Sequence, residues 1–360
     1  MTRSRRAPRA AALAGVAVAI ALTACTATGR EPAASPSPEI ASVPSVTPAP
    51  TAPAVPRVFL LTSSDDVNPA HLAAQAALET MARGKGWSLR RLAAGADTLD
   101  QALTQEPMLV VSVATGLGAS ITQAAAVHPE LRLVAIDEAD AQPSTNLLVI
   151  GPRVREDEAA FLAGALVGIT NTNNRVGWIG EPGSVRGTLV RNAFIHGVRF
   201  TCPLCWVFEE GAAEGASIET GTAAAELLLA RYVETAGAFP SPAGDGALLA
   251  LATGPARVAG SRAGFGAQVL SSQPDAAGNL LGEVQVHPAL LLTEALPRFL
   301  AGEVFGEPLV YQIENGGLGY APFSTPWITP GLQANLQEMM GRLAAGELQI
   351  GVNPETGEEQ

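Results

Sequence analysis

The sequence predicts an α/β protein built from two lobes, each with a doubly wound parallel sheet. Short apolar runs alternate with segments of helical spacing from residue 57 onward, which is typical of βαβ units. The same alternation starts again after residue 153. Residues 57–360 are enough for two lobes of ordinary size.

The first half contains apolar runs bounded by loop residues, which predict strands. Alanine-rich stretches of helical spacing lie between them and predict helices. The expected strands cover residues 57–62, 87–92, 108–113, 131–136 and 146–150, and the expected helices cover 71–83, 99–105 and 121–127.

The second half opens with its clearest unit, residues 154–180. Acidic residues at 156–158 suit a helix N-terminus. The apolar run 175–180 ends in glycine, as a parallel strand entering a ligand-facing loop would. Further strands are expected at 206, 246–252 and 267–270, and helices at 187–198, 222–235, 290–300 and 332–345.

Three segments, in order, carry a family resemblance. REDEAAFLAGALVG at 155–168 with RVGWIG at 175–180, NAFIHGV at 192–198 and ENGGLGYAP at 314–322 resemble the basic membrane protein, or purine nucleoside receptor A, family of solute-binding lipoproteins. The resemblance covers roughly residues 57–350. It implies a type I periplasmic-binding-protein fold, a nucleoside-like ligand held between the lobes, and no enzymatic activity.

The family fold also implies where the lobes begin and end. Residues 57–153 with 284–306 are expected in the N-terminal lobe, and 154–283 with 307–350 in the C-terminal lobe. Residues 351–360 are expected to form a tail. In such folds the ligand lies where loops at the carboxyl ends of the strands face each other.

The N-terminus is predicted to be a secretory leader with a lipid-attachment cysteine. Four arginines precede a short apolar run, and Leu-Thr-Ala-Cys ends at Cys25, as in a lipobox. An ordinary signal peptide or an uncleaved anchor are the alternatives, although the run is short for a spanning helix. Residues 26–56 are rich in Pro, Ala, Ser and Thr and read as an extended linker.

Charge and motifs exclude several functions. The formal net charge is −12, and removing the leader with its four arginines leaves −16, which argues against nucleic acid or anionic lipid as the main partner. The sequence has no GxSxG, Walker or HExxH motif, and its four histidines are scattered. No catalytic centre, metal site or cofactor is therefore expected.

Cys202 and Cys205 form a single CxxC in TCPLCW. One such pair is half of a zinc-ribbon pattern, and no second half follows. In an exported chain a local disulfide is expected. Free thiols and a thioredoxin-like redox pair are the alternatives.

Polar residues at expected strand ends are the ligand candidates. Asp137 ends an apolar strand, at the place of a ligand-facing aspartate in the family. Asp66 and Asn68 follow the first strand, and Asn68 matches a family asparagine. A helix cap is the alternative for each. Gly180 and Ser184 lie in the loop after the VGWIG strand, where backbone donors would face the ligand.

The chain also departs from the family pattern at places that imply base stacking. Val67 replaces an aromatic residue, and the loop after 248–254 lacks a second one. Only the second acid of a late family motif is kept, as Asp275, and Gln285 falls where the family has a lysine. Stacking contributes strongly to base affinity. A ligand held mainly by hydrogen bonds to Asp137, Asn68 and loop backbone is therefore expected, with Asp275 and Gln285 contributing from the opposite side.

The functional prediction follows from these features together. The leading hypothesis is a lipid-anchored solute-binding protein on the extracytoplasmic face of the cell membrane, which delivers a small polar ligand to the permease subunits of an ABC importer. The alternative keeps the fold but makes the lipoprotein a sensor or interaction module without transport. A thiol–disulfide enzyme using Cys202 and Cys205 is a third hypothesis.

Overall fold

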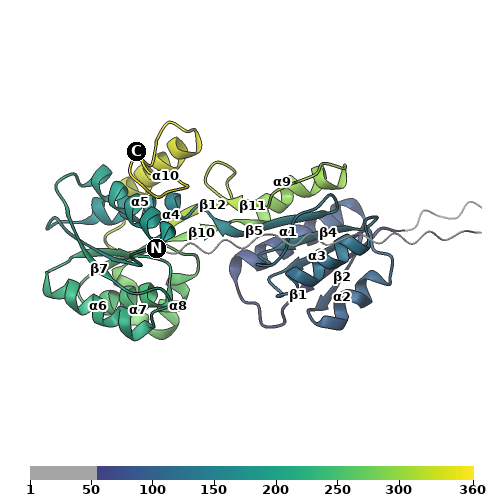
Figure 1. Cartoon of the computed structure of the whole chain (residues 1–360), viewed down its shortest axis with the longest axis horizontal. Helices are drawn as coiled ribbons and strands as arrows, with labels where there is room; N and C mark the ends of the chain where they lie inside the picture. Colours follow the sequence, from purple (N-terminus) through teal and green to yellow (C-terminus); the bar gives the residue numbers. More distant parts are fainter. Residues whose placement is uncertain (1–54) are drawn as a thin grey trace, which may run out of the picture. The chain divides into compact units, whose positions relative to one another are not determined.

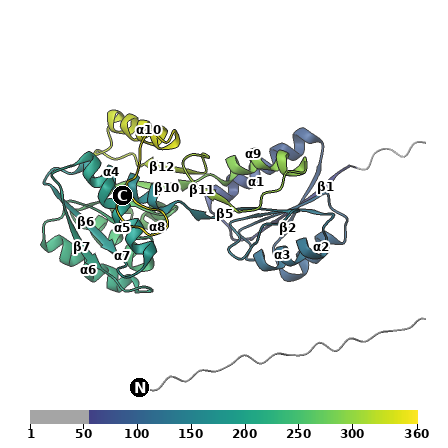
Figure 2. The same ribbon diagram turned by 45° about the horizontal axis from the view of Figure 1, so that its top comes forward.

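The computed structural model describes residues 55–360. Cys25 and nearly all of the expected linker lie outside the described residues. Two six-stranded sheets, each flanked by helices on both faces, make up the described part (Figures 1 and 2). No helix within it is both long and apolar enough to cross a membrane.

The first sheet contains the strands of the first half and one late strand. Its order is β11-β5-β4-β3-β1-β2, with every neighbouring pair parallel. The strands are β1 (Arg57–Thr62), β2 (Ser88–Ala93), β3 (Leu109–Val113), β4 (Arg132–Ile136), β5 (Leu147–Val154) and β11 (Leu309–Tyr311).

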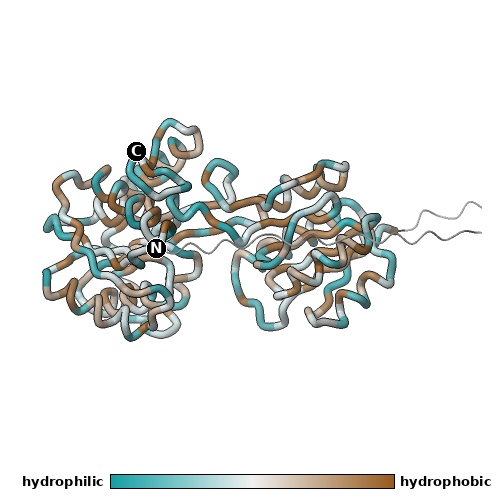
Figure 3. Tube along the Cα trace, in the orientation of Figure 1, coloured by the Kyte–Doolittle hydropathy of each residue, from teal (hydrophilic) through white to brown (hydrophobic). Residues whose placement is uncertain are grey.

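Alternating side chains of this sheet enter two separate cores. Val58 and Leu60 pack in the core that contains α1 (Pro69–Lys85) and α9 (Pro288–Leu300). Phe59 and Leu61 face the opposite side, with α2 (Ala96–Leu103) and α3 (Gly118–Val127). A parallel sheet covered on both faces explains why its strands read as continuous apolar runs, which appear brown in Figure 3.

The second sheet has the order β12-β10-β9-β8-β6-β7, and only β12 runs antiparallel to its neighbour. Its strands are β6 (Arg175–Gly180), β7 (Trp206–Gly211), β8 (Thr235–Ala238), β9 (Arg257–Gly260), β10 (Leu280–Val286) and β12 (Leu318–Pro322). Its helices are α4 (Glu156–Thr170), α5 (Val185–Thr201), α6 (Ile218–Ala230), α7 (Pro242–Thr253), α8 (Phe265–Ser272) and α10 (Pro330–Ala344).

Two glycines of the family-like segments let α4 and α5 approach each other closely. A Cβ added at Gly164 would overlap the carbonyl oxygen of Phe194, and one at Gly197 would overlap that of Phe161. The glycine of FLAG and the glycine of HGV therefore serve helix packing. These two matches say nothing about the ligand.

Two predicted strands of the second half are wrong. Residues 246–252 lie in α7, and 267–270 lie in α8. A short apolar run does not distinguish a buried helix from a strand. The sequence did contain a signal for the start of a helix at residues 241–242. Ser241 accepts a hydrogen bond from the Gly244 N–H at 3.1 Å, and Pro242 follows it, as at a capped helix N-terminus.

Four strands of the second sheet were also missed or misassigned. The expected helix 222–235 ends at Ala230, and its last residue opens β8. β9, β10 and β12 were not predicted. β8 and β9 have only four residues each and contain Ala and Gly, which carry little strand preference.

The chain passes three times between the sheets, and two of the passages are joined by hydrogen bonds. β5 leads to α4, β10 leads to α9, and β11 leads to β12. The Arg155 N–H donates to the Tyr311 carbonyl at 2.9 Å, and the Ile313 N–H donates to Glu158 Oε2 at 2.7 Å. β11 belongs to the first sheet, although residues from 307 onward were expected in the second lobe.

The residues expected as a tail are packed. Val352 and Glu359 form an antiparallel bridge, and Asn192 in α5 donates its Nδ2–H to the Gly357 carbonyl at 2.8 Å.

After the C-terminal end of α5, Cys202 and Cys205 are joined by a disulfide just before β7.

Candidate functional site

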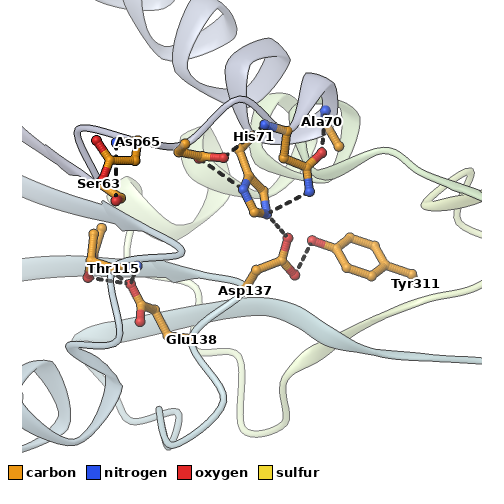
Figure 4. Close-up of polar contacts among 11 residues, drawn as sticks. Ser63, Asp65, Ala70, His71, Thr115, Asp137, Glu138 and Tyr311 are labelled. Atoms are coloured by element: carbon orange, nitrogen blue, oxygen red, sulfur yellow. Dashed lines mark hydrogen bonds and ion pairs between the residues drawn. The ribbon is translucent and has the colours of Figure 1, made fainter. Parts of the chain in front are cut away.

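Asp137 forms the centre of a hydrogen-bonded group at the carboxyl edge of the first sheet (Figure 4). It follows β4, and its backbone turns to a φ of 55°, which ends the strand. Its Oδ1 accepts the Tyr311 hydroxyl at 2.9 Å, and its Oδ2 lies 3.0 Å from His71 Nε2. Both carboxylate oxygens of Asp137 therefore have partners within the chain.

His71 connects Asp137 to Asp66. Its Nδ1 lies 2.9 Å from Asp66 Oδ2, and its side chain is 12% exposed. Burial lowers the pKa of His71, but hydrogen bonds and charge from Asp137 and Asp66 outweigh it, so that the pKa is raised. The two carboxylates therefore favour the protonated form of the imidazole ring.

Tyr311 completes the group from β11, far along the chain. It is 1% exposed, and burial together with the negative charge of Asp137 raises the pKa of its hydroxyl. The hydroxyl therefore stays protonated and donates to Asp137. This bond ties the passage between the sheets to the end of β4.

Asn68 lies beside this group and begins α1. Its backbone N–H donates to Asp66 Oδ1 at 3.0 Å, and its side-chain oxygen caps the Ala70 N–H at 3.0 Å. The side-chain oxygen of Asn68 is therefore a helix cap, which was the alternative to a ligand contact. Its amide nitrogen lies 3.5 Å from His71 Nε2. Because Nε2 donates to Asp137 Oδ2 at 3.0 Å, it offers the Asn68 amide no acceptor.

Glu138 follows Asp137 and makes a second buried cluster. Its Oε1 accepts from the hydroxyls of Ser112 and Thr115 at 2.6 and 2.7 Å and from the Thr115 N–H at 2.8 Å. Its Oε2 is buried without a hydrogen-bond partner. This cluster fixes the loops after β3 and β4 next to Asp137.

A cavity of about 530 Å³ brings Asn68 and Gln285 to one site. The N-terminal turns of α1 and α9, the start of α8 and the end of β10 enclose it. Its walls are largely apolar, and its polar lining residues are Asn68, Glu283, Gln285 and His287. An apolar cleft with a few convergent polar groups is typical of a small-molecule site.

Two of these polar groups have shifted pKa values. Burial raises the pKa of Glu283, against the Gly266 N–H at 2.6 Å and the charge of Arg262, which lower it. Burial lowers the pKa of His287, so that its ring is neutral at pH 7. The cavity therefore offers neutral donors and acceptors with at most one carboxylate, and no cation to pair with an anionic ligand.

Gly180 and Ser184 lie elsewhere. Gly180 lines a different cavity of about 450 Å³ at the ends of β6 and β7. An added Cβ there would come within 2.6 Å of Trp178 Nε1. Ser184 caps α5 by accepting the Gly187 N–H at 2.8 Å. The structure does not bring either residue into the cavity with Asn68.

The expected position of Asp275 at a ligand-facing strand end is wrong. Residues 274–279 form a 3-10 helix ahead of β10, and Asp275 is exposed there. Because β10 runs parallel to β9, this point lies at the amino edge of the second sheet. Gln285, near the end of the same strand, lies at the carboxyl edge.

The expected lack of a second aromatic residue rested on a predicted strand at 246–252 that does not exist, because residues 242–253 are helical. The loop after residue 254 leads into β9 and lies at the amino edge of the second sheet. The carboxyl end of β8 is followed by Phe239, which is 2% exposed and lies 4.5 Å below the Arg186 guanidinium. Phe239 is thus covered by its own chain. Val67, by contrast, is 83% exposed.

Sequence reasoning missed His71 and Tyr311. His71 is one of the four scattered histidines, and it lies in the first turn of α1. Its spacing from Asp66 was the available signal. No signal in the sequence indicated Tyr311, because its partner Asp137 lies 174 residues earlier. No group of three or more His, Cys, Asp or Glu side chains in residues 55–360 could hold a metal ion.

Comparisons with known proteins support the fold. No family model matches the sequence, and no curated protein matches it either. The structure is similar to a solute-binding protein of an ABC transporter system from Conexibacter woesei DSM 14684, with a TM-score of 0.59 and 18% identity over 82% of this chain and 98% of that one.

Two further solved structures are similar. A transcriptional activator of the comK gene from Bacillus halodurans has a TM-score of 0.58 and 12% identity, over 81% of this chain and 99% of its own. The arabinose-binding protein AraP from Geobacillus stearothermophilus has a TM-score of 0.51 and 13% identity, over 79% and 99%. These similarities confirm the predicted two-lobed α/β fold. The resemblance to the basic membrane protein family stays a prediction.

Proposed function

We propose that the chain is a lipid-anchored, extracytoplasmic solute-binding protein of an ABC-type importer. The observation that carries this proposal is the cavity of about 530 Å³ lined by Asn68 and Gln285 from two different lobes. Lobes that share a ligand can close on it and release it to permease subunits. The leader with Cys25 and the solved structure named as an ABC transporter solute-binding protein support the same function.

The proposed ligand is a small, uncharged molecule with several hydroxyl groups. The cavity offers the amides of Asn68 and Gln285, the neutral ring of His287 and the carboxylate of Glu283, which suit hydroxyl donors and acceptors. Its alanine, valine and proline walls suit the apolar face of a sugar ring. AraP is named as an arabinose-binding protein.

Sugars and nucleosides both belong to this class. The family-like segments favour a nucleoside. The cavity favours a sugar, because no Phe, Tyr or Trp side chain lines it and stacking contributes much of the affinity for a base.

A sensor or interaction module is the second candidate. One observation favours it specifically: both oxygens of Asp137 are already bonded to Tyr311 and His71, which leaves this carboxylate no unpaired oxygen for a ligand. The similar structure from Bacillus halodurans is named as a transcriptional activator, so that the fold alone does not decide for transport.

The deciding experiment is a thermal-shift screen against pentoses, hexoses, nucleosides and amino acids. A ligand that binds only the folded chain raises its melting temperature, by an amount that grows with ligand concentration. We expect a shift with a neutral hydroxyl-bearing compound and none with amino acids. A shift only with charged compounds would contradict the proposed ligand class. Uptake assays with the compound that the screen finds would separate transport from sensing.

A further inference from the structure

A separate cavity of about 450 Å³ lies at the amino edge of the first sheet. Trp87 and Met108 directly precede β2 and β3, and Arg132 opens β4. Because these strands are parallel, the cavity lies at the edge opposite to Asp137. It is distinct from the candidate ligand site.

The walls of this cavity are apolar side chains that the fold leaves partly uncovered. Met81 comes from the end of α1, Leu300 from the end of α9, and Trp87 and Met108 from the strand edge. All four pack on the core of the first lobe without being fully buried. A ligand with a hydrocarbon chain would remove this surface from water.

The two charged residues that line the cavity are both basic. They are Lys85, the single lysine of a chain with a net charge of −12, and Arg132. Neither forms an ion pair within residues 55–360, whereas Arg91 nearby pairs with Glu79. Arg132 donates one Nη1–H to the Thr145 carbonyl at 3.0 Å and lies 5.3 Å from the Phe299 ring centroid.

Lys85 lies in the last turn of α1, but it is not needed there as a partner for the carbonyl groups at the end of the helix. A cation in the last turn of a helix commonly interacts with the terminal carbonyls. In α1 the Gly86 N–H reaches the carbonyls of Ala82 and Arg83, and the Trp87 N–H also reaches Ala82. The backbone itself satisfies these carbonyls, so that the ammonium group remains available.

We infer that this cavity binds an amphipathic anion of the fatty-acid class. The hydrocarbon chain lies against Met81, Trp87, Met108 and Leu300, and the carboxylate lies between Lys85 and Arg132. A free fatty acid and an anionic membrane lipid share this chemistry. The acidity of the whole chain disfavours an anionic membrane surface, so that we assign the monomeric carboxylate. The inference does not depend on the proposed transport function.

Calorimetric titration with decanoate tests the inference on the chain from residue 26 onward, which keeps every residue that the structure describes. We expect saturable binding with one site. Lys85→Gln and Arg132→Gln should each weaken binding about fivefold or more, because a charge-assisted bond is lost. Arg83→Gln, which removes a cation from the same helical turn but outside the cavity, is the matched control and should bind like the wild type.

Fluorescence quenching locates the site. A decanoate with bromine at the end of its chain should quench the wild type, and Trp87→Phe, which keeps three other tryptophans, should lose most of the quenching. Circular dichroism checks that each variant is folded.

Three outcomes would overturn the inference: no binding of decanoate, equal binding by all three charge variants, or equally tight binding of the uncharged decyl maltoside. Binding to phosphatidylglycerol vesicles but not to decanoate would contradict the assignment of a monomeric ligand.

Discussion

Replacing Asp137 by alanine tests the group that joins the first sheet to β11. The side chain is 13% exposed and takes part in two charge-assisted hydrogen bonds, each contributing about 1.5–3 kcal/mol. Its loss also leaves the buried Tyr311 hydroxyl without an acceptor, a penalty of about 1–3 kcal/mol. Because these contributions overlap, we expect Asp137→Ala to lower the free energy of unfolding by about 3 kcal/mol.

A double-mutant cycle separates the two parts. Tyr311→Phe removes only the hydroxyl and should cost about 1 kcal/mol. The double variant has no orphaned hydroxyl, so that its loss should be about 1 kcal/mol smaller than the sum of the single losses. Urea unfolding followed by circular dichroism measures all four proteins. A loss below about 1 kcal/mol for Asp137→Ala, or strict additivity, would refute the account of this group.

Three further predictions concern other parts of the chain. The pKa of His71 is raised in the folded state above 6.5, so its stabilisation is complete below pH 6.5 and is lost as the pH rises through the folded pKa; the stability difference between wild type and His71→Gln should shrink over that range, and a constant difference would contradict the shift. Cys25 should incorporate labelled fatty acid in the exporting cell, and equal labelling of Cys25→Ser would disprove the lipobox. Cys202 and Cys205 should be found disulfide-bonded by mass spectrometry without reduction, and free thiols there would exclude the bond.

The sequence predicted the first sheet well because local and tertiary preferences agree there. The strand containing Val58 and Leu60 is apolar on both faces, and polar loop residues mark its ends. The second sheet was harder. The run around Leu248 is as apolar as a buried strand. It forms the helix α7, whose apolar residues pack against α6 and the second sheet. Only the cap at Ser241 distinguished the two structures.

The candidate site could be predicted only where strand ends identify it. Asp137 follows a clear apolar strand, and Asp66 and Asn68 precede a helix, so that all three were placed at one edge. Tyr311 reaches Asp137 from a three-residue strand whose pairing with β5 spans more than 150 residues. Asp275 lies in the 3-10 helix ahead of β10 and Gln285 lies near the end of that strand. Their placement at opposite edges of the sheet depends on where β10 begins, which the local pattern does not reveal.

In the proposed function, a small polar ligand binds in the cavity at the carboxyl edges of the two sheets. Gln285 lines it, is exposed, and its side chain makes no hydrogen bond within residues 55–360, so that its substitution should leave the fold intact. Asp275 lies at the other edge and is the matched control. The measurement is calorimetry on wild type, Gln285→Ala and Asp275→Ala with the ligand from the thermal-shift screen. We expect affinity about five- to tenfold lower for Gln285→Ala, because one hydrogen bond is lost, and unchanged affinity for Asp275→Ala. Unchanged affinity for Gln285→Ala with a loss for Asp275→Ala would contradict it.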